Sequence, residues 1–425
     1  MYRLTHNLFM RKYKLFLAAI LLLGSVHNTY SQNVSSPYSV IGIGDIESSY
    51  FNHTSGMANT GIAYQNDKQI TLNNPASLSG LQNQLFLVDL YGRGKFVTYT
   101  GKTLPNSLTG KDFSVERLSL GMRVTKWWGS TIGLMPFSTS NYSFSGTKNL
   151  QGTNSTLPVK YDGSGGINRF FFANGFRITK NLSVGVNTSF LGGSLRQKDS
   201  LVSPDLSTAL FTTKNIYIRD WYFEYGLQYH IPVSKKWDVN IGATYAAQTA
   251  LRDQNTALVL DETGDTLSNR VISNTFFTLP STTGFGIAVS KNRQLTFVAD
   301  YRFQDWKTLN IKGLNYSLVN SNRYSVGAEY SKQKVYVGVP YETFSLQAGL
   351  FYDQSYLKIY NQQLNDVGFT LGAGLNSKRS TLSYHLSFEY GVRGSHNTPI
   401  KENYAGFTVG LSFKDFWYTK GRKYE

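Results

Sequence analysis

Apolar and polar residues alternate along most of the chain between residues 84 and 414. Residues 382–391 read LSYHLSFEYG, with an apolar or aromatic side chain at every second position, and the same rhythm runs through residues 182–190, 367–375 and 407–413. A period of two predicts β-strands with one apolar and one polar face. Several runs reach roughly 10 to 16 residues, whereas globular strands average about 5 to 6 and a tilted membrane strand needs about 9 to 11. The pattern therefore favours strands that cross a membrane.

The alternating region divides into fourteen expected strands with alternately short and long connections. The strands are expected at 84–100, 113–126, 129–145, 165–178, 181–196, 214–230, 236–250, 271–290, 293–306, 322–332, 343–355, 366–377, 380–394 and 402–414. Short turns on one side and longer loops on the other are typical of outer-membrane barrels, and closure removes the sheet edges that lipid cannot solvate. The fold class expected is all-β, a 14-stranded antiparallel transmembrane β-barrel over residues 83–414. Because the strand number is even, both chain ends are expected in the periplasm.

Small hydroxyl residues followed by lysine recur at the ends of the even-numbered strands. They are Thr125-Lys126, Thr179-Lys180, Ser234-Lys235, Ser290-Lys291, Ser331-Lys332 and Ser377-Lys378. In a tight turn the hydroxyl can bond the backbone, and the lysine keeps the turn in water. These pairs support the assigned order of strands.

Residues 1–31 have the parts of a secretory signal peptide. Arg3, Arg11 and Lys12 precede the apolar run at residues 15–23, and Ser31 stands before Gln32. The run is about nine residues long, well short of the roughly 20 that a membrane-spanning helix needs, so an N-terminal membrane anchor is the less favoured alternative. Residues 1–31 are therefore expected to direct export.

Composition agrees with a membrane barrel and argues against several other classes. Aromatic residues make up 15% of the chain, there are 39 Gly and 10 Pro, and there is no Cys. Aromatic and glycine richness with few charges suits a barrel whose outer face is apolar and whose ends carry aromatic girdles. The net charge of +16 is scattered over turns and strand ends and forms no basic stripe, so nucleic acid is not expected as a partner.

Residues 32–82 interrupt the pattern, because they show no sustained alternation. A fourteen-stranded barrel leaves a lumen unless something fills it, and this segment is the expected filler, a hatch or plug. Within it, Asn74, Pro75 and Ala76 form an expected turn, because Pro75 biases Asn74 away from the helical region and an Asn side chain can bond nearby backbone. An ordinary exposed turn is the alternative.

At these residues the chain resembles the FadL-type long-chain fatty acid transporters. The resemblance is carried by Gly56-Met57-Ala58, Gly61-Ile62-Ala63 and Asn74-Pro75-Ala76, followed by fourteen strands. It implies a short N-terminal hatch inside a fourteen-stranded barrel, with Asn74, Pro75 and Ala76 as hatch residues. It also implies uptake of small hydrophobic molecules, which would pass from an external site to a lumen pocket gated by the hatch and leave sideways through the wall. The Ser-Gln at the end of the signal peptide resembles exported proteins of the Bacteroidota.

Strand phase places several charged residues on the inner face of the barrel. On the outer face, a Lys or Arg in contact with lipid would cost about 2–4 kcal/mol at the midplane of the membrane. A lumen network that braces the hatch is the favoured interpretation, and a polar ligand path is the alternative. His230 and His385 are lumen candidates, but two isolated His do not predict a metal site. No nucleophile motif, cofactor motif or metal motif is found, so neither an enzyme nor a cofactor is expected. The expected inward charges are Arg117, Arg123, Glu224, Asp300, Arg302, Glu329 and Glu389.

Two further function classes stay open from sequence. One is a barrel that does not transport and serves as an accessory subunit of a larger outer-membrane secretion or protein-assembly complex. The polar loops and the basic-aromatic tail at residues 415–425 would suit this class. The other is an outer-membrane enzyme of phospholipase type, which the missing nucleophile motif disfavours. Expected partners are outer-membrane lipids, a hydrophobic ligand, other outer-membrane proteins and the barrel-insertion machinery.

Overall fold

The computed structural model describes residues 36–47, 49–101, 106–149, 156–203, 208–313, 315–336, 339–376 and 382–416. The signal peptide expected at residues 1–31 and most of the tail expected at 415–425 lie outside these residues. No helix of the described chain is long and apolar enough to cross a membrane.

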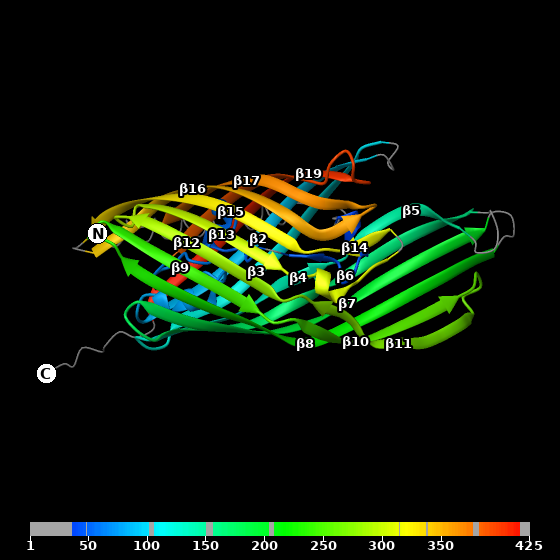
Figure 1. Ribbon diagram of the computed structural model, residues 1–425, viewed down its shortest axis with the longest axis horizontal. Helices are drawn as coiled ribbons and strands as arrows, with labels where there is room; N and C mark the ends of the chain where they lie inside the picture. The colour runs from blue at the N-terminus through cyan, green and yellow to red at the C-terminus, as the bar shows by residue number, and fades with distance from the viewer. Residues whose placement is uncertain are drawn as a thin grey trace, which may run out of the picture. The chain divides into compact units, whose positions relative to one another are not determined.

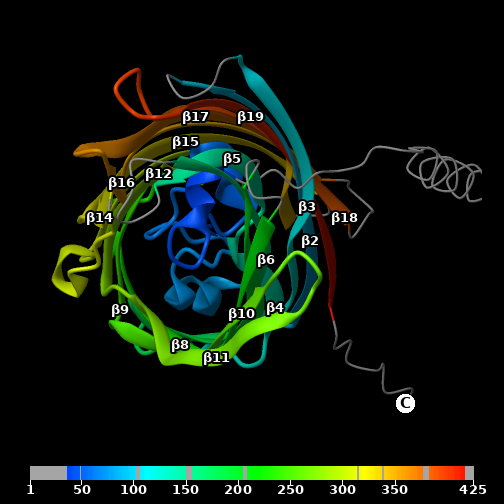
Figure 2. The same cartoon turned by 90° about the vertical axis from the view of Figure 1, so that its right-hand side faces the viewer.

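The strands close into an antiparallel barrel, which Figures 1 and 2 show from the side and from one end. The first wall strand, β2, pairs with the last, β19, from Leu85↔Phe416 to Thr100↔Lys401, so this seam has no open edge. The wall strands are β2 (Leu85–Thr100), β3 (Leu108–Arg123), β4 (Trp128–Thr139), β5 (Tyr142–Asn149), β6 (Thr156–Arg177), β7 (Leu182–Ser203), β8 (Thr208–Pro232), β9 (Trp237–Ala246), β10 (Thr249–Leu260), β11 (Thr266–Leu279), β12 (Thr282–Lys291), β13 (Leu295–Gln304), β15 (Ser321–Tyr336), β16 (Val339–Ile359), β17 (Gln362–Asn376), β18 (Leu382–Arg393) and β19 (Lys401–Phe416).

The expected fourteen-stranded barrel is confirmed. Three of its strands are kinked and carry two labels each: β4 and β5 pair in succession with β6, β9 and β10 pair in succession with β8, and β11 and β12 pair in succession with β10 and β9. The short β14 (Tyr316–Leu318) is an addition to β16 at one end.

The two faces of the wall differ as the alternation requires. Large apolar side chains point outward and are exposed, for example Phe297 at 50%, Leu350 at 59% and Leu371 at 51%. Inward positions are held mainly by small or polar residues such as Ser183, Thr370 and Ser412, which are buried. An apolar outer band around a polar interior is the arrangement that lipid demands of a barrel.

Several long connections expected from sequence are instead strand. Residues 156–164, 197–203, 208–213, 251–260 and 266–270 continue the ladders of β6, β7, β8, β10 and β11. These extensions carry the sheet past the membrane-sized segment at the end away from the short turns (Figure 1). The expectation of loops there was wrong because these segments lack a sustained apolar alternation, although their backbone hydrogen bonds continue the ladders.

Two of the short turns use hydroxyl residues singled out in the sequence, whereas Ser331-Lys332 lies within β15, which continues to Tyr336, so the strand end expected there was wrong. Thr179 Oγ1 accepts hydrogen bonds from the Asn181 and Leu182 N–H groups at 3.2 and 3.0 Å. In the next short turn, Ser234 Oγ accepts from two backbone N–H groups at 3.2 Å. Ser377-Lys378 lies outside the described residues.

The segment before the wall lies inside the ring, as Figure 2 shows in blue. We call residues 36–84 the plug. It contains three short 3-10 helices and one two-residue strand: η1 (Pro37–Val40), β1 (Asp45–Ile46), η2 (His53–Met57) and η3 (Pro75–Gly80). Most of its side chains are buried, including polar ones such as Asn52, Asn74 and Ser77, so its contacts with the wall decide what the barrel can do.

Candidate functional site

The turn at Asn74 fixes one side of the plug. Asn74 is fully buried and precedes η3, where its side-chain oxygen accepts a hydrogen bond from the Ala76 N–H at 3.0 Å. Its Nδ2 group donates to the carbonyls of Ile62, in the plug, and Leu227, in β8, at 2.9 and 3.0 Å. The turn thus satisfies itself and bonds the wall at the same time, which removes the cost of burying a polar turn.

Glycines of the wall let the turn come close. A Cβ atom on Gly226 of β8 would lie 2.0 Å from Asn74 Oδ1, and one on Gly185 of β7 would lie 2.3 Å from the Ala76 nitrogen. No residue with a side chain fits at either position without moving plug backbone or the Asn74 side chain. These glycines explain why Pro75 and Ala76 can lie directly against the strands.

Two side chains of the far wall hold the middle of the plug through its backbone. Asp300 Oδ2 on β13 accepts the N–H groups of Gly61 and Ile62 at 2.6 and 3.0 Å. Thr370 on β17 accepts from the Ala58 N–H at 2.7 Å and donates to the Gly56 carbonyl at 2.9 Å. The two Gly-x-Ala runs noted in the sequence are therefore the stretches whose backbone bonds the wall.

A buried polar cluster joins η2 to three wall strands. His53 Nε2 lies 2.5 Å from Glu329 Oε2 on β15, and the same carboxylate accepts from Tyr64 Oη at 2.8 Å and Gln347 Nε2 at 2.6 Å. His53 Nδ1 lies 3.3 Å from His385 Nδ1 on β18. Burial is the largest single influence and lowers the pKa of His53, but the charge and hydrogen bond of Glu329 together with the charge of Glu342 outweigh it and raise that pKa above its ordinary value. The cluster is an ion pair between plug and wall.

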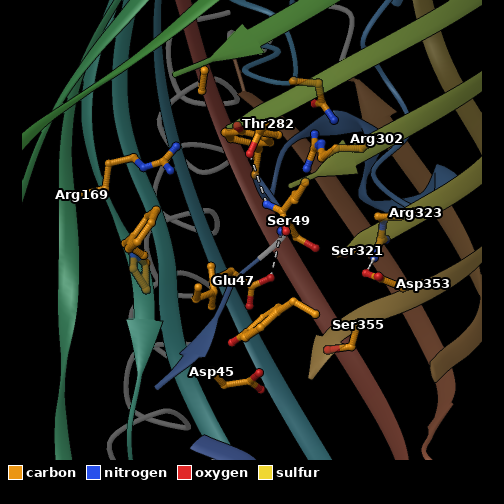
Figure 3. Close-up of a pocket in the computed structure, with 18 of the residues that line it drawn as sticks. Asp45, Glu47, Ser49, Arg169, Thr282, Arg302, Ser321, Arg323, Asp353 and Ser355 are labelled. Carbon is orange, nitrogen blue, oxygen red and sulfur yellow. Dashed lines mark hydrogen bonds and ion pairs between the residues drawn. The ribbon is translucent and has the colours of Figure 1, made fainter. Parts of the chain in front are cut away.

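A polar cavity of about 210 Å³ lies between the plug and the strands (Figure 3). Charged side chains line it and form ion pairs with one another, of which Figure 3 shows Arg323 with Asp353. The pairs are Arg169 with Glu224 at 2.9 Å, Arg93 with Glu389 at 3.1 Å and with Glu47 at 3.7 Å, Arg323 with Asp353 at 3.1 Å and Arg393 with Asp45 at 2.9 Å. Asp45 belongs to the plug, and Tyr50 of the plug donates to Glu224 at 2.7 Å. The cavity therefore presents paired charge, which an acyl chain or an aromatic hydrocarbon cannot bind favourably.

A layer of apolar side chains lies beyond the cavity, toward the strand extensions. Tyr38 and Ile43 of the plug pack there with apolar residues of the wall and of the connection after β13, all of them buried. The wall and connection residues of this layer include Phe137, Ile167, Leu195, Ile218, Leu251, Phe277 and Trp306. These apolar contacts hold the first part of the plug against the wall.

The wall is split between β3 and β4. The two strands pair only from Arg123↔Gly129 to Leu118↔Leu134, so the part of β3 at residues 108–117 has β2 alone as a described neighbour. The facing part of β4 pairs instead with the plug, through Asp45↔Thr139 and Ile46↔Ser138. The polar cavity is lined in part by Ile46 and Phe137 and so extends to this split.

The structure places all seven expected lumen charges on the inner face, but in separate groups. Glu224 and Glu389 join the cavity pairs, and Arg302 lines the same cavity with its guanidinium over the Tyr50 ring, 5.7 Å from its centre. Glu329 and Asp300 bind the plug as described above. Arg117 pairs with Asp89 at 2.7 Å on the inner wall. Arg123 donates to the carbonyls of Leu81, Thr125 and Lys126 where the plug enters the wall.

Strand phase missed the partners of these charges. Arg169 and Arg93 lie on strands β6 and β2 and point inward. Their position in the alternation of those strands would have placed them in the lumen, but it does not identify the carboxylates that they bind. His53, Tyr64 and Asp45 lie in the plug, which has no period from which a direction could be read. His230 lies at a wall end, 2.7 Å from Asn240 Oδ1, apart from His385. Among the described residues no group of His, Asp and Glu has the arrangement of a metal site.

Comparison with known proteins gives one family and one fold. A family model described as BamG matches residues 10–425. No curated protein matches the chain. Among solved structures, a FadL homologue of Pseudomonas aeruginosa is 13% identical with a TM-score of 0.58, covering 89% of this chain and 100% of that one. The toluene transporter TbuX of Ralstonia pickettii is 16% identical with a TM-score of 0.55, covering 85% and 97%. The toluene transporter TodX of Pseudomonas putida is 16% identical with a TM-score of 0.55, covering 88% and 99%.

These likenesses establish the fold. The resemblance to FadL-type proteins holds at the level of architecture, an outer-membrane type of barrel with the fold of channels for hydrophobic compounds. Because proteins of one fold can have different functions, the function of this chain has to be inferred from the residues of its inner surface.

Proposed function

Because the chain belongs to the BamG family and its own N-terminal segment fills its barrel, we propose that it is a non-transporting subunit of a larger outer-membrane secretion or protein-assembly complex. Its barrel would sit in the outer membrane with both chain ends in the periplasm. The single observation that carries this proposal is the charged contact between plug and wall, with Asp45, Tyr50 and His53 of the plug bonded to charged wall residues.

The energetics of the plug favour a fixed part over a gate. The plug is held by the bonds of Asn74, by the backbone bonds to Asp300 and Thr370, and by the His53–Glu329 ion pair. Each buried hydrogen bond contributes about 1 kcal/mol net, and breaking a buried ion pair costs about 3–5 kcal/mol when one charge is left alone. The hydrocarbon part of a ligand offers no polar group that could replace these partners. Opening the lumen for such a ligand is therefore unfavourable.

The test is purification of the tagged full-length chain from native membranes in mild detergent. We expect other outer-membrane proteins to co-purify in fixed stoichiometry, and deletion of the gene to leave the uptake rate of a radiolabelled long-chain fatty acid unchanged. A chain that purifies alone, in cells whose fatty acid uptake falls when it is removed, would contradict the subunit function.

The split between β3 and β4 favours a second candidate function, uptake of small hydrophobic molecules. The solved structures of similar fold include transporters of toluene, and the split offers a sideways exit at the point where the cavity meets the wall. In this candidate the plug would gate the passage by detaching β1 from β4.

A reversible cross-link tests this second candidate directly. The chain contains no Cys, and Ile46 and Ser138 are register partners, close enough for a disulfide. In the double variant Ile46→Cys/Ser138→Cys, uptake through the split would stop under oxidising conditions and return with reductant. The subunit function predicts the same complex and the same uptake in both states. The single variant Ser138→Cys is the matched control.

A further inference from the structure

The outer face of the wall carries an apolar groove where β12, β13, β15, β16 and β17 lie side by side (Figure 1). Its floor is formed by Ala299, Ala328 and Ala348. Ala328 and Ala348 are register partners, and the same row of the sheet continues to Phe297 on one side and to Leu371 on the other. Small side chains between large ones leave a hollow of about 720 Å³, which is within the range of roughly 300–1,000 Å³ of small-molecule sites. We call this hollow the wall groove.

The wall groove belongs to the part of the barrel that faces hydrocarbon. The large side chains around it are exposed and apolar, among them Val326 at 50% and Leu350 at 59%. No charged side chain lines it. A hydrocarbon chain lying in the groove would contact protein atoms on its floor and on both sides, and these contacts add up because each carbon pair contributes a small attraction.

Exposed cations lie at the end of the wall groove that carries the short turns. On β15, Lys332 lies four residues past Ala328. On β12, Lys291 lies two residues past Val289, which lines the groove. Side chains alternate between the two faces of a strand, so both lysines lie on the outer face with the groove. At about 3.3 Å per residue, they lie roughly 7–13 Å beyond these groove residues along their strands.

The turn after β12 brings two further cations to the same place. Gln333 lies between Lys332 and Lys334 on β15. Its Nε2 group donates to the carbonyl of Arg293, in the turn that follows Lys291, at 3.0 Å. The turn is thus held against the end of β15. All four cations are exposed, so a cluster of positive charge lies at one end of the wall groove.

No carboxylate of the described residues forms an ion pair with these four cations. The carboxylates nearest in register are Asp238 and Glu342, and each is the partner of a residue adjacent to one of the lysines. Their side chains therefore lie on the opposite face of the sheet. Asp238 Oδ1 lies 3.6 Å from His230 Nε2, and Glu342 accepts from Asn376 Nδ2 at 3.3 Å. The positive charge on the outer face is thus left for an anion from outside the chain.

Aromatic side chains place the cations at the depth of lipid headgroups. Tyr330 is 48% exposed and Trp237 38% exposed on the outer face. Lys291 Nζ lies over the Trp237 ring, 5.3 Å from its centre. Exposed Tyr and Trp residues mark the boundary between hydrocarbon and headgroups. A phospholipid with a net negative charge has an anionic head at this boundary and an acyl chain on its hydrocarbon side, which is the order of the cations and the groove.

We propose that the outer wall binds one anionic phospholipid, with an acyl chain in the wall groove and the headgroup phosphate held by Lys291, Arg293, Lys332 and Lys334. Each Lys or Arg near an anionic lipid surface strengthens binding about five-fold, and the groove adds contacts that a flat barrel wall does not offer. With the short turns in the periplasm, the lipid belongs to the periplasmic leaflet. The inference goes beyond the proposed subunit function and needs only that the barrel lies in a bilayer.

The experiment titrates the full-length protein in mild detergent with phosphatidylglycerol or with phosphatidylcholine of the same acyl chains. Native mass spectrometry counts the bound lipids. We expect one phosphatidylglycerol to bind about ten-fold more tightly than phosphatidylcholine. A large excess of inorganic phosphate should not displace it, because free phosphate makes no contact with the groove.

Charge variants test the headgroup contact. Lys291→Gln/Lys332→Gln should weaken phosphatidylglycerol binding about ten-fold, whereas Lys291→Arg/Lys332→Arg should retain most of it. The matched control is Lys126→Gln/Lys180→Gln, two exposed cations of other short turns, which should leave binding unchanged. All four positions are exposed, so the barrel should assemble normally, and its heat-dependent gel migration checks this.

A groove variant tests the acyl-chain contact independently of charge. Ala328→Phe fills the floor of the wall groove and should weaken binding of both lipids by the same factor, about five-fold. The matched control is Ala405→Phe on β19, on the same face as the exposed Phe407 and outside the groove. It should leave the binding of both lipids unchanged.

A cross-link in native membranes identifies the occupant of the groove. The chain contains no Cys, so Ala348→Cys carries a single photoreactive benzophenone, which should react with lipid. Reaction with a protein would overturn the inference and identify the groove as a surface for a membrane partner. Equal binding of the two lipids, displacement by inorganic phosphate, or unchanged binding in Ala328→Phe would each overturn it as well. Displacement by phosphate would identify the cations as a site for the free anion.

Discussion

Replacement of Gly185 by alanine tests whether close contact with the wall fixes the plug. An added Cβ atom would lie 2.3 Å from the Ala76 nitrogen and 2.4 Å from the Pro75 carbonyl carbon. Ordinary contact between such atoms is about 3.5 Å, so the plug backbone would have to move away by about 1 Å. Overpacking of this kind costs about 1–3 kcal/mol, and losing one wall bond of Asn74 adds about 1 kcal/mol.

The expected result is faster opening of the plug with an intact barrel. A loss of about 2–4 kcal/mol corresponds to amide exchange about 30-fold to 1,000-fold faster in residues 74–81. Hydrogen exchange of the full-length protein in detergent measures this, and the wall strands report whether the barrel is intact. The matched control is Gly94→Ala on β2, where an added Cβ would meet nothing within 4 Å. Equal exchange of residues 74–81 in the two variants would refute the view that steric fit positions the plug.

Three further predictions concern the polar contacts of the plug. Asn74→Ala should lower the free energy of plug opening by about 2–3 kcal/mol, because the hydrogen bonds of Asn74 are lost. Hydrogen exchange measures this, and Asn397→Ala, at an exposed position, is the control. An equal effect of the two variants would contradict the prediction. Because the pKa of His53 is raised, its stabilising ion pair with Glu329 should be fully formed below the ordinary pKa of about 6.5. The ion pair should be lost as pH rises through the raised value. Hydrogen exchange of the plug, measured against pH, should show this loss of stability in the native protein and not in His53→Gln. Thr370→Val keeps the shape but removes one accepted and one donated bond, so plug opening should become easier by about 1–2 kcal/mol, and unchanged protease sensitivity of the plug would argue against it.

The strand order could be predicted from the sequence because membrane strands have strict chemistry. In β18, the residues Tyr384, Leu386 and Phe388 alternate with His385 and Ser387, and lipid permits no other arrangement. The ends of the strands could not be predicted. In β7 and β8 the residues near Lys198 and Thr212 are paired as a ladder but are polar at successive positions, so the sequence there reads equally well as loop.

The partners within the lumen could not be predicted, for a different reason. Strand phase places Glu224 inward, but its contact with Arg169, which lies two strands away on β6, depends on the stagger of the barrel. Alternation fixes which face a side chain points to and leaves the height of its neighbour open. His53 lies in the plug, where the chain has no period at all, and only the folded plug brings it against Glu329.

The fold and the lumen chemistry point to different uses of one architecture. A channel for hydrophobic compounds needs an apolar passage past its plug, whereas the cavity here is lined by ion pairs such as Arg323–Asp353 and Arg393–Asp45. One member of the second pair is plug and the other is wall, so moving β1 separates two charges inside the barrel. The Arg393 and Asp45 side chains are only 11% and 25% exposed, so separating them has a cost, although a smaller one than the roughly 3–5 kcal/mol of a fully buried pair, and the hydrocarbon part of a ligand returns none of it. The ion pair of Asp45 with Arg393 on β18 therefore opposes the movement of β1 that would open the β3–β4 split, which favours a barrel that presents surfaces to other proteins over one that passes molecules through its centre.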